Sequence, residues 1–204
     1  MAMTTSDHYF SEKQVSPSTP TTYAVNVRKL QLTLAGDRGV FNHGELDWGT
    51  RVLLENASLP SGGELLDLGC GGGAIAAALA TLRPDAHVWA VDVNERARDV
   101  ARRTMTLNSL TNVTVAAPDE VPAELVFDAM WSNPPIRIGK SELHDLLDRW
   151  LTRLSSNGCA DLVVHKNLGS DSLATWLSGR GYEVVRHASK QGYRILHVTP
   201  PSHF

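Results

Sequence analysis

The stretch over residues 64–74, ELLDLGCGGGA, constrains the fold of this chain more than any other part of the sequence. It begins with residues that can form a buried strand, continues through Gly69, Gly71, Gly72 and Gly73, and runs into an alanine-rich segment. Glycine adopts backbone angles that are closed to other residues, and it leaves no side chain between the chain and a ligand. The free amides at the start of the following helix would face whatever lies above the turn. The stretch therefore predicts a strand, a ligand-binding turn and a helix.

Asp67 narrows the kind of ligand that this turn can accept. With Ala74 in the third position, the turn matches the loose G-x-G-x-x-[G/A] pattern of dinucleotide-binding proteins, which is a weak signal by itself. A carboxylate at the end of the strand would repel a pyrophosphate, whereas it suits a cationic ligand. The sulfonium and the amino group of S-adenosylmethionine carry such charge. We therefore expect a sulfonium-bearing adenosine ligand.

Strands and helices alternate after the glycine turn. Seven strands are expected at residues 65–68, 87–93, 113–116, 125–132, 159–165, 182–188 and 193–199, and helices begin at 74 and lie over 95–107, 141–154 and 171–179. This alternation is typical of an α/β fold with a doubly wound, mainly parallel sheet that is covered on both faces. Only residues 189–192 separate the last two strands, which is too few for a helix, so we expect a hairpin with one antiparallel strand.

The N-terminal part of the chain predicts smaller elements. Residues 1–22 are rich in Ser, Thr and Pro and predict an irregular arm. Residues 23–204 fit a single domain, in which 23–45 form an accessory hairpin and loop and 46–204 form a Rossmann-like core. The segment FNHGELDWGT, at 41–50, precedes an expected helix. Its polar side chains either cap that helix or belong to a loop that closes over the cofactor or the target.

Composition limits the classes of function. The formal net charge of −3 argues against extensive coating of nucleic acid, although it leaves room for a local basic patch. The two cysteines, Cys70 and Cys159, have no partner at metal or disulfide spacing and predict reduced thiols, and the eight histidines suggest no metal site. No apolar run approaches the roughly 18 residues of a membrane span, and no signal core is visible. We expect a cytoplasmic protein without a metal or a membrane partner.

Acidic residues at two strand ends fit an adenosine ligand. In an open sheet of this kind, the ligand lies at the carboxyl ends of the strands. Asp92 lies about 20 residues beyond the glycine turn, which is the spacing of a carboxylate that accepts from ribose hydroxyls, although Asp92 or Asn94 could instead cap the next helix. Asp119 could accept from the adenine amine, but Ala117 and Pro118 leave its register open.

The sequence Ser132-Asn133-Pro134-Pro135 marks the end of the fourth strand. Its two prolines have fixed backbone angles and no amide hydrogen, so the neighbouring carbonyls should form a rigid rim. An asparagine side-chain oxygen beside a fixed carbonyl gives two acceptors that can hold the two hydrogens of a planar amine. Such dipeptides also form ordinary turns. At a strand end after a glycine turn and an acidic second strand, we favour the amine-binding interpretation.

The order LDLGCGGG, VDVN and SNPP resembles that of class I S-adenosylmethionine-dependent methyltransferases, specifically the "methyltransferase small" family that includes 16S ribosomal RNA guanine-N2 methyltransferases. The resemblance covers nearly the whole chain and implies a doubly wound seven-stranded sheet with an antiparallel last strand. It implies that the methionine part is held by Asp67, Gly69 and Gly71, the ribose by Asp92, and the adenine by Asp119 or a neighbour, with Cys70 and Val93 also among the cofactor-binding residues. The target amine would be held by Asn133, Pro134 and Pro135.

Ile136 departs from the family pattern, which often has Phe or Tyr at this position to stack on a flipped-out base. An isoleucine offers no π face, and the loss of stacking would weaken base binding by about 1–3 kcal/mol. Phe41, Trp48 or Trp131 could supply an aromatic ring instead. This departure affects the prediction of a nucleobase target more than the prediction of the cofactor.

Three basic residues near the expected target site could meet RNA phosphates or could be ordinary solvated charges: Arg137, Lys140 and Lys166. We predict an N-methyltransferase that acts on an exocyclic amine of a base in RNA, with guanine N2 of 16S ribosomal RNA as the expected target. The expected partner is ribosomal RNA or the small ribosomal subunit. The alternatives are a protein glutamine methyltransferase of the release-factor type, a nicotinamide-dependent oxidoreductase and a non-catalytic binder. The sequence leaves open whether the protein is a monomer or a dimer.

Overall fold

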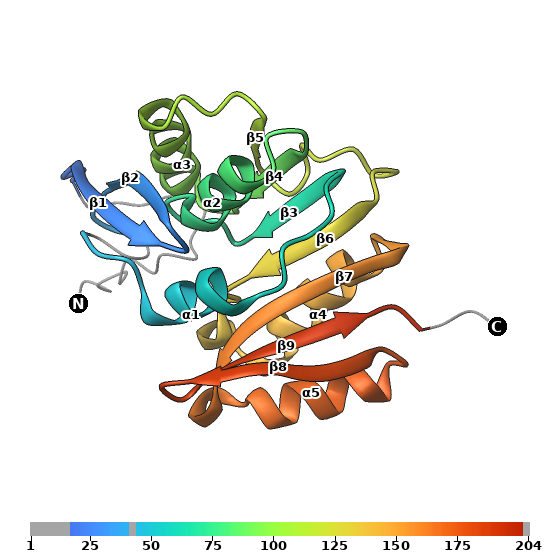
Figure 1. Cartoon of the computed structure of the whole chain (residues 1–204). Coiled ribbons are helices and arrows are strands. Elements are labelled where there is room, and N and C mark those ends of the chain that lie inside the picture. The colour runs from blue at the N-terminus through green and yellow to red at the C-terminus, as the bar shows by residue number, and fades with distance from the viewer. Residues whose placement is uncertain (1–16, 41–43, 202–204) are drawn as a thin grey trace, which may run out of the picture.

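The computed structural model describes residues 17–40 and 44–201 of the chain. Its main element is a seven-stranded sheet with the order β5-β4-β3-β6-β7-β9-β8 (Figure 1). The strands are β3 (Glu64–Leu68), β4 (His87–Val91), β5 (Val113–Ala116), β6 (Phe127–Ser132), β7 (Leu154–His165), β8 (Glu183–Lys190) and β9 (Tyr193–Thr199). All pairs are parallel except those of β9, which is antiparallel to both neighbours. The predicted doubly wound sheet with an antiparallel last strand is confirmed.

Helices cover both faces of the sheet. Helices α1, α2 and α3 lie on one face and α4 and α5 on the other (Figure 1). Apolar side chains of the first three join one core cluster, and those of the last two join the other. The helices are α1 (Trp48–Asn56), α2 (Ala74–Leu82), α3 (Glu95–Leu107), α4 (Lys140–Leu151) and α5 (Ser170–Gly179), with short 3-10 helices η1 (Ile136–Ile138) and η2 (Lys166–Leu168). Among the described residues, no helix is long and apolar enough to cross a membrane.

The chain order reverses beside β3, and this positions the site. From β3 the chain moves outward through β4 to β5, and it then returns to β6 on the other side of β3. Neighbouring crossovers therefore leave β3 in opposite directions, which opens a crevice at the carboxyl ends of β3 and β6. The Ser132 hydroxyl donates to Leu68 O at 2.7 Å and joins these two strand ends.

Strand β7 begins earlier than the predicted residue 159. Phe127 pairs with Leu154 and Ala129 pairs with Cys159, so the register shifts between the two pairs. A side chain at Gly158 would stand 2.9 Å from Phe127 O, which explains the glycine in this irregular segment. The irregularity has no periodic signature in the sequence, and it therefore escaped prediction.

The predicted hairpin before the core is present as a separate two-stranded sheet of β1 (Thr21–Val27) and β2 (Leu30–Gly36). Strand β1 begins inside the segment predicted to be irregular, of which residues 1–16 lie outside the described part. The hairpin packs on α3, where Ala35 N donates to the Thr104 hydroxyl at 3.1 Å. The same hydroxyl donates to Gly72 O at 2.7 Å. Thr104 thus joins the hairpin to the back of the glycine turn.

Candidate active site

A cavity of about 430 Å³ lies where β3, β4, β6 and β7 end and where β9 begins. It is lined by Asp47, Leu68, Gly69, Gly71, Val91, Asp92, Val93, Ala97, Pro118, Asn133, Pro134, Pro135, Ile136, Arg137, Leu146, Trp150, Val163, His165, Leu168 and Tyr193. The lining combines apolar surface with a few polar groups from separate strand ends, which is typical of a small-molecule site. Gly69 and Gly71 of the glycine turn and the Asn133-Pro134-Pro135 sequence therefore meet in one cavity.

The glycine turn forms one wall of this cavity. Gly69 has φ = 73°, in the left-handed region, and both Gly69 N and Cys70 N donate to Val91 O, at 2.8 and 3.0 Å. A side chain at Gly69 would meet no atom nearer than Pro135 Cδ, at 4.0 Å. The turn and the proline rim therefore face each other across open space. Cys70 lies behind the turn, where it lines a small cavity of about 30 Å³.

Asp67 lies beneath the turn and not in the wall of the main cavity. Its side chain is fully buried, and Asp67 Oδ2 accepts from Ala76 N, in the first turn of α2, at 2.9 Å. Burial, together with the nearby Asp92 carboxylate, raises the pKa of Asp67 to about 8. Because burial also raises the pKa of Cys70 well above its usual value, that thiol is not an activated nucleophile. The structure places Asp67 where it can hold the start of α2 and the turn in position.

Asp92 reaches the cavity from the end of β4. Asp92 Oδ2 accepts from Gly71 N and Oδ1 accepts from Asn94 N, both at 2.9 Å. Asn94 caps α3 by accepting from Arg96 N at 3.0 Å, so the capping role falls to Asn94 and leaves Asp92 in the cavity wall. Burial is the main cause that raises the pKa of Asp92.

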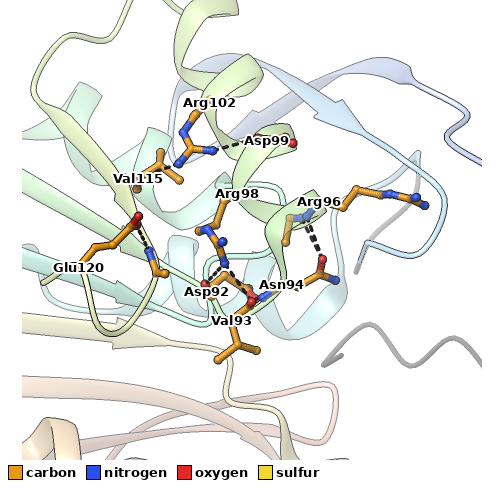
Figure 2. A network of polar contacts seen from close by, with 11 residues as sticks. Asp92, Val93, Asn94, Arg96, Arg98, Asp99, Arg102, Val115 and Glu120 are labelled. Atoms are coloured by element: carbon orange, nitrogen blue, oxygen red, sulfur yellow. Dashed lines mark hydrogen bonds and ion pairs between the residues drawn. The ribbon is translucent and has the colours of Figure 1, made fainter. Parts of the chain in front are cut away.

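Arg98 holds the backbone of this segment. Its Nη1 donates to Asp92 O and to Val93 O, both at 2.9 Å, and Figure 2 shows the guanidinium reaching from α3 over the two carbonyls. This contact was not visible in the sequence. In the same view, Arg102 donates to the Asp99 carboxylate and to Val115 O, farther along α3.

Asp119, which was expected to accept a hydrogen bond from the adenine amine, lies outside the cavity lining. Asp119 is exposed, whereas its neighbour Pro118 belongs to the lining. The turn after β5 is held by Glu120, which accepts from Ala117 N at 2.5 Å. The geometry therefore brings an apolar surface, and not the Asp119 carboxylate, to this end of the cavity.

The Asn-Pro-Pro rim forms the opposite wall. Asn133 Nδ2 donates to Asp47 Oδ2 at 2.8 Å and to the Thr50 hydroxyl at 3.1 Å. Pro134 O accepts from Ile136 N at 2.8 Å, which leaves one lone pair of that carbonyl for a ligand. The contact of Asn133 with the helix start at Asp47 was not visible in the sequence.

Predicted target-binding residues are only partly in the cavity. Ile136 and Arg137 line it, whereas Lys140 and Lys166 are exposed and stand outside the lining. Of the rings proposed to replace an aromatic at Ile136, Trp131 is buried in the core and Trp48 is 54% exposed outside the lining, while Phe41 lies outside the described residues.

Tyr193 and His165 supply the aromatic wall that sequence reasoning missed. Both line the cavity, and their rings meet edge to face with centroids 4.9 Å apart. Tyr193 is the first residue of an antiparallel strand, so it lies at the same edge as the ends of the parallel strands. The predicted hairpin could therefore have indicated that Tyr193, at the start of its second strand, lies at the site. Among the described residues, no cluster of His, Cys, Asp and Glu could hold a metal ion.

Comparisons with known proteins agree with this geometry. The family model "Methyltransferase small domain" matches residues 31–197. The chain is 33% identical over 195 residues to a Bacillus subtilis (strain 168) protein named "Uncharacterized protein YbxB", and the match covers 94% of this chain and 97% of that protein. It is also 33% identical over 158 residues to ribosomal RNA small subunit methyltransferase C of Shewanella loihica, covering 74% of this chain and 46% of the relative.

A solved structure has the same fold. The 16S rRNA N2 G1207 methyltransferase of T. thermophilus, in complex with S-adenosylmethionine and guanosine, superposes with a TM-score of 0.77 and 20% identity, over 92% of this chain and 53% of that chain. The chain spans about half the length of the ribosomal RNA methyltransferases that it matches.

Proposed function

Because this chain belongs to the methyltransferase small domain family and is an S-adenosylmethionine-dependent methyltransferase, we propose that it methylates an exocyclic amine of a base in ribosomal RNA, with guanine N2 of 16S rRNA as the target. The observation that carries the proposal is the glycine turn facing the Asn-Pro-Pro rim across one cavity. The names of the relatives support RNA as the substrate. Membership of this methyltransferase family argues against the alternative of a nicotinamide-dependent oxidoreductase.

The residues on the turn side fit S-adenosylmethionine. Asp92 keeps a second lone pair on each carboxylate oxygen, and these lone pairs can accept from the two ribose hydroxyls. Gly69 leaves the space above the turn open. The carboxyl group of Asp92, in the cavity wall, suits a cationic ligand better than a pyrophosphate. When bound there, S-adenosylmethionine would supply an electrophilic methyl group on a sulfonium, with a neutral thioether as the leaving group.

The residues on the rim side would orient the amine. In the proposed complex, the Asn133 side-chain oxygen and Pro134 O accept the two amine hydrogens, which directs the nitrogen lone pair toward the methyl group. An amine conjugated to a ring is a weak nucleophile, and these hydrogen bonds also stabilise the positive charge that develops on nitrogen during transfer. Most of the rate enhancement would then come from positioning. Tyr193, which lines the same cavity, would supply the aromatic ring that Ile136 lacks.

Basic residues around the cavity suit an RNA substrate. We assign phosphate contacts to Arg137, which lines the cavity, and to the exposed Lys140 and Lys166 beside it. We further propose that residues 23–204 act as a single domain, with 23–45 as an accessory unit of the core over 46–204.

The test of this function is tritium transfer from labelled S-adenosylmethionine to small ribosomal subunits, free 16S rRNA and purified release factors. We expect label in RNA, and nucleoside mass spectrometry of that RNA should identify N2-methylguanosine. Label that appears only in a release factor would favour the glutamine methyltransferase and refute the RNA proposal. Label in RNA at another nucleoside would retain RNA as the substrate and refute the assignment to guanine.

A further inference from the structure

We propose that Asp47, the residue that caps helix α1, positions the Asn133 amide so that its oxygen faces the target amine. This proposal rests on the function assigned above, because it concerns how the same rim is kept ready for that amine. The segment 41–50, which contains Asp47, was predicted only to cap a helix or to form a closing loop. The structure places its carboxylate between the helix start and the rim.

The contacts around the Asn133 amide are specific. Asp47 Oδ2 accepts from Thr50 N at 3.0 Å, as a helix cap does, and the same oxygen accepts from Asn133 Nδ2 at 2.8 Å. The Thr50 hydroxyl, at 3.1 Å, takes the other hydrogen of the amide. Both Asn133 N–H groups are thereby used. Within residues 17–40 and 44–201, no donor is found against Asn133 Oδ1, which leaves this oxygen available to a ligand.

The charge of Asp47 fixes which way the amide points. The oxygen and nitrogen of an asparagine side chain have nearly the same shape, so packing alone does not choose between the two orientations. An ionised carboxylate accepts hydrogen bonds and cannot donate them. If the Asn133 amide were flipped, its oxygen would face the Asp47 carboxylate with no hydrogen between them. The pair is therefore stable in only one orientation, with Asn133 Oδ1 directed away from α1.

This orientation matters for transfer. A flipped amide would present two N–H donors to an amine that must itself donate, and the rim would lose one of its two acceptors. Loss of a group that orients a reacting partner typically lowers the rate by about 10- to 100-fold. We therefore expect Asp47 to act mainly on kcat. Binding of the cofactor, which depends on the turn side of the cavity, should change little.

Helix-capping variants separate positioning from folding. Serine and asparagine cap helices about as well as aspartate does, so both Asp47→Ser and Asp47→Asn should retain α1. The serine side chain is too short to reach Asn133, whereas asparagine reaches it without the charge. We expect thermal unfolding and the Kd for S-adenosylhomocysteine to stay close to wild type in both variants. The kcat of Asp47→Ser on small ribosomal subunits should fall by about 10- to 100-fold, with a smaller loss for Asp47→Asn.

A swap tests the pairing directly. Asn133→Asp alone would set two carboxylates against each other, whereas Asn133→Asp combined with Asp47→Asn removes this like-charge contact. We expect the double variant to exceed the Asn133→Asp single variant in kcat. Equal activity of the two, or wild-type kcat in Asp47→Ser, would overturn the proposal.

A readout without activity keeps this proposal distinct from the proposed function. In wild-type protein with ¹⁵N-labelled asparagine, the Asn133 side-chain N–H signals should exchange slowly with solvent, and Asp47→Ser should abolish this protection. Rapid exchange in the wild type would refute the positioning role even if the protein methylates RNA. Slow exchange that is lost in Asp47→Ser would support it even if the substrate proves to be another amine.

Discussion

Replacement of Gly69 by alanine should separate cofactor binding from folding. Gly69 has φ = 73°, and an added methyl group would meet only Pro135 Cδ, at 4.0 Å. The fold therefore has room for the methyl group, and the main effect on stability is the left-handed backbone. That conformation destabilises a non-glycine residue by about 1–2 kcal/mol. We expect Gly69→Ala to remain folded with a lowered melting temperature.

The same methyl group would stand in the space between the glycine turn and the proline rim. A ligand that fills this space would have to shift, and an extra methyl group in a packed site typically weakens packing by about 1–3 kcal/mol. Since each 1.4 kcal/mol is a factor of ten, the Kd for S-adenosylhomocysteine should rise by roughly 5- to 150-fold. Activity at low cofactor concentration should fall by a similar factor.

Gly181→Ala provides the matched control. Gly181 has φ = 93°, has no atom within 4 Å of an added methyl group and follows the end of α5. The backbone strain should be similar, while the cavity stays unchanged. Calorimetric titration with S-adenosylhomocysteine and thermal unfolding of both variants would compare the two effects. If Gly69→Ala binds as tightly as Gly181→Ala at equal loss of stability, the cofactor does not occupy the space above Gly69.

Three further predictions concern individual side chains. Because the pKa of Asp67 is raised from 3.8 to about 8, its protonated form favours the folded state, and ligand-free protein should lose stability as pH rises between these values. Melting temperatures measured at several pH values should show this loss in the wild type and not in Asp67→Asn, and the same pH dependence in both proteins would contradict the burial argument. The hydrogen bond from His197 Nδ1 to Asp161, at 2.8 Å, raises the pKa of His197, so the stability that this pair adds should be complete below pH 6.5 and disappear as pH rises through the raised value. The urea midpoints of Asp161→Asn and wild type should therefore converge at high pH, and a difference that stays constant with pH would refute this. Tyr193→Ala should raise KM for the RNA substrate by roughly 5- to 150-fold through lost stacking, while Tyr193→Phe should stay near wild type; equal losses would assign the effect to the hydroxyl.

The cavity residues that could be predicted from the sequence are those that directly follow a recognisable buried strand. Gly69 and Gly71 follow a buried strand directly, and Asp92 and Asn133 lie at the ends of strands whose direction is fixed by the helices between them. In a parallel sheet, such ends must come to one edge. Their presence in a single cavity therefore follows from the order of the elements, without knowledge of any long-range contact.

The parts that were missed depend on side-chain direction and on long-range pairing. Asp67 follows Leu65 by two residues, so both side chains point to the same face of β3, the one covered by α1–α3, and Asp67 meets α2 there instead of entering the cavity. Because this strand is buried on both faces, hydrophobicity alone gave no sign of the direction. The contact of Asp47 with Asn133 joins residues 86 positions apart and has no signature in the sequence around either residue.

The hydrogen bonds of Thr104 couple the local unfolding of the hairpin to that of the glycine turn. A two-stranded hairpin is only marginally stable by itself, so β1 and β2 depend on α3, and the hydroxyl of Thr104 links Ala35 to Gly72. Residues that share such contacts tend to unfold locally as one unit. We expect backbone amides of the hairpin and of the glycine turn to exchange hydrogen with a common opening free energy. The glycine turn would then lose its structure only together with a hairpin that contributes no residue to the lining of the main cavity.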